Sequence, residues 1–414
     1  MEKKLFSKDF TLVIIGQIIS LFGNATVRFA LPLYLLNQTG SSALYGAVTA
    51  CAFIPAILMS PVGGIVADRV NKRNIMVALD LFTAAVITAF CILMGGVNLT
   101  FLMTVTMMLL YGIAGAYQPS VQASIPALVS PDRFMEANSI INSISSVAAL
   151  LGPALGGVLY SVCGLKPVLW ICVACFFLSA VMELFICIPS VKQDFGGGIW
   201  RTVKEDLAGS ARFIRREKPI VWKVVLVLCG INLFLSAMII VGLPYMVTEV
   251  LGLDEALYGF AQGALAAGGL TGGVAAGVFA KKLDIKKSGS LLIAGTGCVF
   301  PIGIAGMILT SAIAVYIVIT VCCFLVMVFS TVFSVQVMTF IQAQTPQNLV
   351  GKVIAVVLTV SMCAQPLGNA LYGVLFQICR GREFMVVLFA GAVSLLIVLR
   401  AKNLFFLVPE RKKW

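Results

Sequence analysis

The chain has 414 residues, of which 60% are hydrophobic and 11% charged, and its mean hydropathy is +1.05. This composition excludes a soluble globular protein of that length. A dozen apolar runs, each near the roughly 20 residues that cross a bilayer as a helix, alternate with short polar turns.

The net charge of +12 follows membrane topology and does not indicate nucleic-acid binding. If the first helix starts in the cytoplasm, 25 of the 29 basic residues lie on the cytoplasmic side, three lie outside, and Arg28 lies within a helix. This positive-inside pattern places both termini in the cytoplasm. The 12 cysteines show no paired spacing, so we expect no disulfide, metal or cofactor. Histidine is absent, so a coupled proton would have to reside on a carboxyl group.

Helix 1 is predicted from about Phe10 to Leu36, in an apolar run too long for a signal peptide. Its polar residues recur every three or four positions and share one face; they are Gln17, Ser20, Asn24 and Arg28. Such a stripe faces either neighbouring helices or a substrate cavity, because an unsatisfied polar group in lipid costs several kcal/mol. We favour the cavity, since a cation within a membrane helix is costly and usually functional.

Helix 2 (about Ser42 to Ala67) and helix 3 (about Asn74 to Gly95) are joined by the segment GGIVADRVNKR. One interpretation is an ordinary basic cytoplasmic loop. The other is a gate in which Asp68 and Arg69 brace one helix pair against another. The segment follows the pattern G-x-x-x-D-R-x-x-[KR]-R, whose defined positions are Gly64, Asp68, Arg69, Lys72 and Arg73.

Two acids lie within predicted helices. Asp80 in helix 3 is either a proton site or, as we favour, a structural ion-pair partner of the loop arginines. Glu183 in helix 6 (about Pro167 to Pro189) either extends toward Lys192 at the helix end or pairs inside the bundle. Both are candidate proton sites.

Helices 4 and 5 add further candidates. Helix 4 (about Leu99 to Ser124) carries polar residues on one face, of which Tyr111 and Gln118 join the candidate cavity. Helix 5 (about Asn138 to Val162) contains LGPALGG. Its glycines permit close packing and its proline bends the helix; the motif residues are Gly152, Pro153, Gly156 and Gly157.

A polar, basic segment at residues 190–219 separates an N-terminal half, 1–189, from a C-terminal half, 220–414, and has the spacing of an amphipathic surface helix. The halves repeat: SALYG at 42–46 matches EALYG at 255–259, and the same offset of 213 residues relates Pro153 to Pro366. The glycines of helix 8 (about Ala256 to Ala280) predict close packing. Asn232 in helix 7 is a further cavity candidate. No phosphate-binding G-x-x-x-x-G-K-[ST] occurs, so ATP is not expected to be the direct energy source.

The loop pattern, the helix 5 motif and the repeated halves resemble the major facilitator superfamily over nearly the whole chain. This resemblance implies an all-α integral membrane fold of twelve transmembrane helices in two pseudo-symmetric six-helix halves. The segments SLFGNATVRFALPLYLLNQTGS, SPDRFMEANS and EDLAGSARFIRR resemble the bacterial drug/proton antiporter branch with its macrolide-efflux and siderophore-exporter relatives. In that branch the helix 5 motif is typical of exporters that work as antiporters, and the loop after helix 2 is a gate.

The chain departs from this branch at two places. Met108 stands where many members carry an arginine four residues before a glycine of helix 4, and helix 1 has Asn24 and Arg28 where many multidrug relatives carry an acid. These departures leave Asp80 and Glu183 as the candidate carriers of a proton.

The sequence therefore predicts a secondary exporter of small amphipathic molecules of the drug or macrolide type. It would work by alternating access, coupled to protons, as a monomer in the bacterial cytoplasmic membrane. One alternative is an importer of the same fold for a nutrient or a lysolipid. Another is a non-transporting receptor or scaffold, which would predict a large folded domain outside the membrane. We do not expect an enzyme, because no nucleophile and base pair or metal cluster is recognisable in the sequence.

Overall fold

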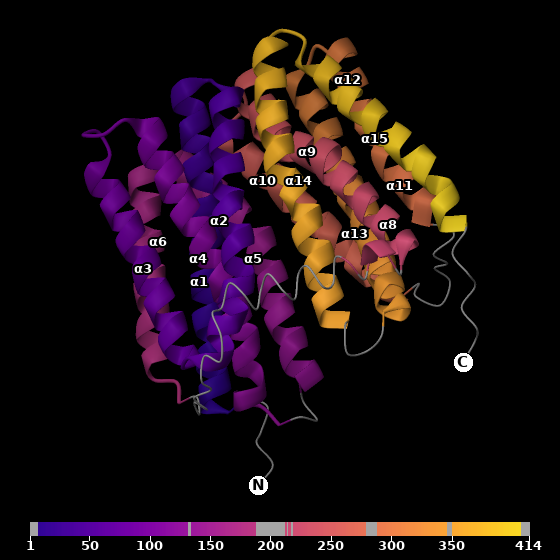
Figure 1. Cartoon of the computed structure of the whole chain (residues 1–414). Helices are drawn as coiled ribbons and strands as arrows, with labels where there is room; N and C mark the ends of the chain where they lie inside the picture. The colour runs from indigo at the N-terminus through magenta and orange to yellow at the C-terminus, as the bar shows by residue number, and fades with distance from the viewer. Residues whose placement is uncertain are drawn as a thin grey trace. The chain divides into compact units, whose positions relative to one another are not determined.

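The computed structural model describes residues 7–130, 134–187, 212, 214–216, 218–278, 288–345 and 350–406, and every named element within them is a helix (Figure 1). The first group is α1 (Lys8–Thr39), α2 (Ser42–Arg69), α3 (Lys72–Leu93), α4 (Leu99–Leu128), α5 (Phe134–Cys163) and α6 (Leu165–Leu184). The second group is α8 (Pro219–Ile231), η2 (Asn232–Ser236), α9 (Ala237–Pro244), η3 (Tyr245–Val250), α10 (Glu255–Val278), α11 (Ser288–Gly297), α12 (Val299–Ile308), α13 (Ala312–Gln344), α14 (Val350–Ile378) and α15 (Glu383–Phe406).

Ten helical stretches of the described residues are long and apolar enough to cross a bilayer. One of them, Pro219–Val250, joins α8, η2, α9 and η3, and another, Gly289–Ile308, covers α11 and α12. Helices α10 and α14, of 24 and 29 residues, fall outside the ten. Together with these two, the described residues contain the twelve long helical segments expected from the sequence.

Local sequence fixes several helix ends. The side chains of Ser7, Asn71 and Asn98 cap α1, α3 and α4 by accepting hydrogen bonds from backbone N–H groups of the first turn. Helix α1 ends at Gly40, whose φ of 57° lies in the left-handed region that glycine adopts without strain. Between the end of α2 at Arg69 and the start of α3 at Lys72, the turn contains only Val70 and Asn71.

Some helix bounds differ from the sequence-based predictions. Helix α6 ends at Leu184, whereas the sequence predicts a helix to about Pro189, so Glu183 lies in the last turn. Helix α5 begins at Phe134, one turn earlier than predicted. The amphipathic helix predicted within residues 190–219 falls almost entirely outside the described residues.

The chain forms two compact units. Unit 1 comprises Met1–Gly40, Ala47–Val203 and Asp254–Gly263, and unit 2 comprises Ser41–Gly46, Lys204–Leu253 and Ala264–Trp414. Each unit therefore includes a short piece from the other half of the sequence. The start of α10 belongs to unit 1, and the start of α2 belongs to unit 2.

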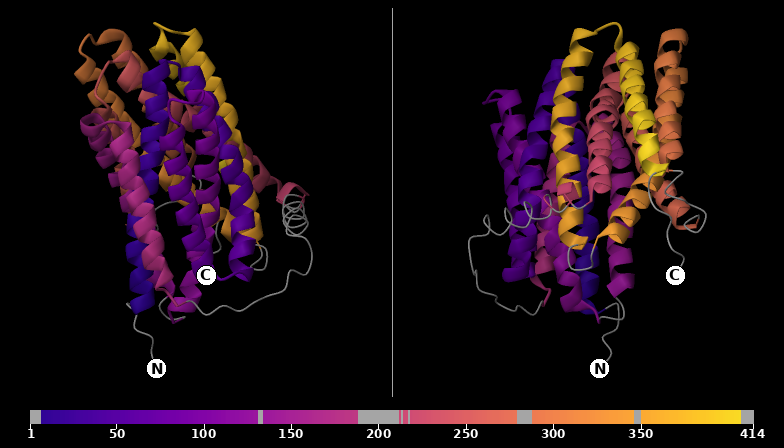
Figure 2. Two further views of the ribbon diagram at one scale, coloured as in Figure 1. Left: turned by 90° about the vertical axis from the view of Figure 1, so that its left-hand side faces the viewer. Right: turned by 45° about the vertical axis from the view of Figure 1, so that its right-hand side comes forward.

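In unit 1, α1 packs against α4, α5 and α6, and α3 packs against α4 and α6 (Figure 2, left panel). Glycines bring α2 and α4 unusually close. A methyl group at Gly63 would lie 2.6 Å from the Cα of Ala116, and one at Gly115 would lie 2.8 Å from the carbonyl oxygen of Ala56. The start of α10 meets α5 in the same way, because a methyl group at Gly157 would lie 3.1 Å from the Cα of Gly259.

In unit 2, α14 packs along α8, η2 and α9, while α15 contacts α8, α11 and α12. The span Pro219–Val250 contains two π-helical segments, and the second follows Pro244 directly. Since proline has no N–H group, it interrupts the regular hydrogen-bond ladder. The helix then closes with a hydrogen bond from the Leu251 N–H to the Met246 carbonyl.

The glycines of α10, the predicted helix 8, pack closely only in part. Gly268 and Gly272 contact the backbone of α13, whereas Gly273 and Gly277 face open space.

The offset between the two repeats is not constant, contrary to the single value of 213 residues predicted from the sequence. Gly152 in α5 packs against Ala25 of α1, and Gly368 in α14 packs against Ala237 of α9. These two equivalent glycines are 216 residues apart, so Pro366 is not the structural counterpart of Pro153. The repeat near SALYG and EALYG keeps the offset of 213, and three extra residues accumulate before α14.

Candidate functional site

A buried polar cluster, formed by Gln17, Ser20, Asp80, Tyr117 and Glu183, joins four helices of unit 1. The side chain of Gln17 on α1 donates from Nε2 to the hydroxyl of Tyr117 on α4, at 2.8 Å. The same hydroxyl donates to Oε1 of Glu183 on α6, also at 2.8 Å. Tyr117 therefore links α1 to α6 through a continuous hydrogen-bonded chain.

Asp80 enters the cluster from α3. Its Oδ1 accepts a 2.9 Å hydrogen bond from the hydroxyl of Ser20 on α1. In the described part of the chain, no lysine or arginine pairs with Asp80. The side chain of Arg69, one of the loop arginines, lies outside that part, so the favoured ion pair stays a prediction. Glu183 is fully buried and bonds inside the bundle, which is the second of the two alternatives for that residue.

The cluster has more hydrogen-bond acceptors than donors. Three fully shielded oxygen atoms accept no hydrogen bond from a described residue: Gln17 Oε1, Asp80 Oδ2 and Glu183 Oε2. Two carboxyl groups in one buried cluster also repel each other when both are ionised. Because a buried acceptor without a donor costs about 1 to 3 kcal/mol, this arrangement favours a bound positive charge.

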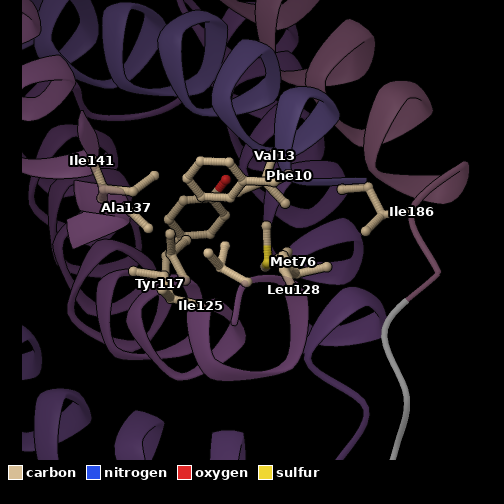
Figure 3. Close-up of a cluster of buried hydrophobic side chains, with 11 residues drawn as sticks. Phe10, Val13, Met76, Tyr117, Ile125, Leu128, Ala137, Ile141 and Ile186 are labelled. Atoms are coloured by element: carbon tan, nitrogen blue, oxygen red, sulfur yellow. The ribbon is translucent and has the colours of Figure 1, made fainter. Parts of the chain in front are cut away.

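An apolar cluster adjoins the polar cluster through Tyr117 and includes residues from the start of α1 (Figure 3). Tyr117 belongs to both, with its ring among apolar side chains and its hydroxyl in the polar cluster. The apolar cluster consists of Phe10, Val13, Met76, Tyr117, Val121, Ile125, Leu128, Val129, Ala137, Ile141 and Ile186.

A second group, formed by Arg28 on α1, Phe53 on α2 and Tyr111 on α4, lies elsewhere in unit 1. The guanidinium carbon of Arg28 on α1 lies 3.7 Å from the ring centroid of Tyr111 on α4, which is a close cation–π contact. Phe53 on α2 meets the Tyr111 ring edge to face, with centroids 5.4 Å apart. The structure thus brings together Arg28 and Tyr111, two of the predicted cavity residues.

The other predicted cavity residues have different surroundings. Gln17 is fully buried and hydrogen-bonds to Tyr117 in the polar cluster. Asn24 and Gln118 are partly buried. Asn232 lies in unit 2, where its side chain donates a 2.9 Å hydrogen bond to the carbonyl of Ser361 and accepts one from Ser236.

The predicted gate loop is described in part. Helix α2 runs through Gly64 to Arg69, but the side chains of Asp68 and Arg69 lie outside the described part of the structure. Arg73 donates to the side chain of Asn74 and, at 3.5 Å, to the backbone carbonyl of Leu184 at the end of α6. Lys72 is the first residue of α3. The loop therefore ties the start of α3 to the end of α6 within unit 1.

The helix 5 motif serves three separate contacts. Gly152 faces Ala25 of α1, where a methyl group would overlap the Ala25 side chain. Gly156 also faces α1, with room for ordinary contact with Thr26, whereas Gly157 faces the start of α10. Helix α5 continues unbroken through Pro153.

Sequence reasoning missed Tyr117 and Phe53. Tyr117 lies on a different face of helix 4 from Tyr111 and Gln118, and nothing local to it indicates that its hydroxyl reaches an acid 66 residues later in the chain. Phe53 lies within a continuous apolar run, where one aromatic residue carries no distinguishing signal.

Long apolar helices in two units, with ionisable groups buried among them, define a multi-pass membrane protein of the transporter class. The sequence profile of the Major Facilitator Superfamily matches residues 13–369, and the chain belongs to this superfamily. It is therefore a transporter rather than an enzyme.

Among similar proteins, macrolide efflux protein A of Streptococcus pyogenes is 26% identical over 177 residues. That alignment covers 42% of this chain and only 44% of the relative. The multidrug efflux pump Tap of Mycobacterium tuberculosis is 23% identical over 379 residues, covering 87% of this chain and 85% of the pump.

Solved structures show the same fold. The nucleoside transporter NupG has a TM-score of 0.78 at 12% sequence identity, covering 96% of this chain and 99% of the transporter. An inward-facing bacterial homologue of the iron transporter ferroportin has a TM-score of 0.73 at 18% identity, covering 97% and 99% of the two chains.

Proposed function

We propose that this transporter is an exporter of small amphipathic molecules that works as a proton antiporter, with Asp80 and Glu183 as the proton site. The observation that carries the proposal is the acceptor-rich cluster of unit 1, in which two buried carboxyl groups have no described cationic partner. The efflux proteins among the relatives support the outward direction of transport.

The hydrogen bonds of the cluster explain why a proton would bind there. Ser20 and Tyr117 each supply one hydroxyl proton, and each is already donated to one carboxyl oxygen. A proton on Asp80 or Glu183 adds a hydrogen-bond donor beside oxygen atoms that lack one. It also removes the repulsion between the two carboxyl groups. Release of the proton restores both penalties, so it requires a change in the surroundings of the cluster.

Tyr117 would communicate the protonation of Glu183 to α1. With Glu183 ionised, the tyrosine donates to Glu183 and accepts from Gln17. With Glu183 protonated, the glutamic acid can donate to the tyrosine, which then donates to Gln17 Oε1 once the amide has turned over. Because Gln17 and Arg28 lie on the same helix, the protonation state of Glu183 would be coupled to the position of α1 near Arg28.

Alternating access would use the remaining predicted elements. In this proposal Gly64, Asp68, Arg69, Lys72 and Arg73 form a gate. The glycines of α5 keep the helix in close contact with its neighbours, while Pro153 supplies the hinge.

The test is uptake of three probes into inverted membrane vesicles energised by respiration: ethidium, erythromycin and dansylglycine. We expect uptake of at least one probe that a protonophore abolishes. Asp80→Asn and Glu183→Gln should each lower it about tenfold or more, because an amide keeps the shape but cannot exchange the proton. Glu249→Gln, an exposed acid of unit 2, is the matched control and should retain uptake.

Three results would contradict the proposal. Accumulation in right-side-out vesicles instead of inverted ones would identify an importer. Uptake that follows an imposed sodium gradient and ignores the protonophore would remove the proton as the coupling ion. Full activity in both amide variants would exclude the cluster as the site.

A further inference from the structure

We propose that Arg28 and Tyr111 form a recognition site for a carboxylate group on the transported molecule. This inference rests on the transport function proposed above and specifies its substrate class as amphipathic carboxylic acids.

The arrangement of Arg28 is unusual for a membrane helix. The residue lies near the middle of α1, with partly buried surface, and its guanidinium group sits over the ring of Tyr111 at 3.7 Å. Phe53 on α2 contacts the Tyr111 ring edge to face. The cation is therefore held in place by contact with a buried aromatic side chain rather than by an anion.

No acid of the described residues neutralises this cation. The acids of unit 1 with defined contacts have other partners: Asp9 accepts from the Cys187 N–H, Asp80 from Ser20, Glu183 from Tyr117, and Glu255 from Asn37. No described side chain or carbonyl accepts a hydrogen bond from the Arg28 guanidinium group. A charge held in the membrane without a counter-ion is costly, so an anionic ligand would be bound strongly there.

The chemistry of the two side chains selects a carboxylate. A guanidinium group presents paired N–H donors that match the two oxygens of a carboxylate, whereas the aromatic contact occupies only its face. The ring of Phe53, which is partly exposed, offers an apolar surface for the rest of an amphipathic molecule. A cationic group would be repelled from the same position.

The experiment measures binding to the purified protein in detergent, by the fluorescence of dansylglycine, dansylaminoundecanoic acid and the methyl ester of each. Each acid and its ester share the dansyl body, so their ratio isolates the carboxylate. We expect the better-fitting acid to bind the native protein about tenfold or more tightly than its ester. This measurement needs no transport and no proton gradient.

Four variants locate the effect. Arg28→Gln should abolish the preference for the acid and leave ester binding within about threefold, while Arg28→Lys should give an intermediate loss because lysine lacks the planar fork. Tyr111→Leu should weaken acid binding by removing the platform under the guanidinium group. Arg382→Gln removes an equal charge from an exposed site in unit 2 and should leave the preference unchanged.

The inference is overturned if neither acid binds more tightly than its ester, or if Arg28→Gln weakens acid and ester equally. Protonophore-sensitive uptake of erythromycin or ethidium in the vesicle assay, together with either of those results, would retain the exporter and reject the carboxylate site. If the purified protein shows a carboxylate preference that depends on Arg28 but the vesicles show no energised uptake, the carboxylate site is retained and the proposed exporter is rejected.

Discussion

Tyr117 donates its hydroxyl proton to Glu183 across 2.8 Å, and this contact connects the middle of α4 with the last turn of α6. The same hydroxyl accepts from Gln17, so one oxygen atom completes two buried hydrogen bonds. Tyr117 therefore joins α1, α4 and α6 through its hydroxyl group.

Replacing Tyr117 with phenylalanine should therefore lower the thermal unfolding temperature in detergent. The substitution leaves Gln17 Nε2 and Glu183 Oε1 without partners, and each loss costs about 1 to 3 kcal/mol. Tyr372→Phe is the matched control, because the Tyr372 hydroxyl is buried without a described partner and its removal should be neutral or stabilising. If both substitutions changed the unfolding temperature equally, the hydrogen bonds of the Tyr117 hydroxyl would not contribute to stability.

The amide variants Asp80→Asn and Glu183→Gln should unfold at temperatures no lower than the native protein. Each amide brings N–H donors to a cluster that has unpartnered oxygens, and each removes one of two repelling charges. Thermal unfolding and energised uptake, measured on the same preparations, should separate: stability is kept while transport is lost. A large drop in unfolding temperature would mean that the ionised carboxyl groups stabilise the fold.

Gly152→Ala should destabilise unit 1 by about 1 to 3 kcal/mol, because the added methyl group overlaps the side chain of Ala25. Gly273→Ala offers the contrast, since a methyl group there meets no atom within 4 Å. In that variant the better helix propensity of alanine should stabilise α10 by up to about 1 kcal/mol. Unfolding of the two variants in detergent tests the contact, and a stable Gly152→Ala variant would show that α1 and α5 separate easily.

Asn71→Ala should weaken the start of α3 by about 1 kcal/mol, because Asn71 Oδ1 accepts the N–H of Arg73 and caps the helix. Asn71→Asp keeps the acceptor and should restore native stability. Amide hydrogen exchange at the first turn of α3 provides the measurement. Exchange that is unchanged in Asn71→Ala would show that other contacts hold this turn.

Much of the fold follows from the sequence, since apolar runs longer than a bilayer crossing have few alternatives to a helix. The helix ends follow less well. Helix α6 ends at Leu184 although the apolar run continues to Pro189. An apolar composition indicates which residues can lie in a bilayer, but it does not indicate where the helical hydrogen bonds end.

The sequence predicted individual residues of the candidate site but not the contacts between them. Arg28, Asp80 and Glu183 stand out in the sequence because charges are rare in membrane helices. Their partners do not, since Tyr117 is an ordinary aromatic residue until α4 and α6 pack together. Asp80 shows the same limit, because its hydrogen bond comes from Ser20 of another helix, which proximity along the chain does not indicate.

The ten residues Asp254–Gly263 complete unit 1, and Ser41–Gly46 complete unit 2. Consequently neither unit can reach its final packing from a continuous stretch of nascent chain. The surface of α5 at Gly157 stays uncovered until the ribosome has made Gly259, about a hundred residues later. A gene split between α6 and α8 would yield two fragments that each lack a helix end, so they should be rescued by co-expression and degraded when made alone.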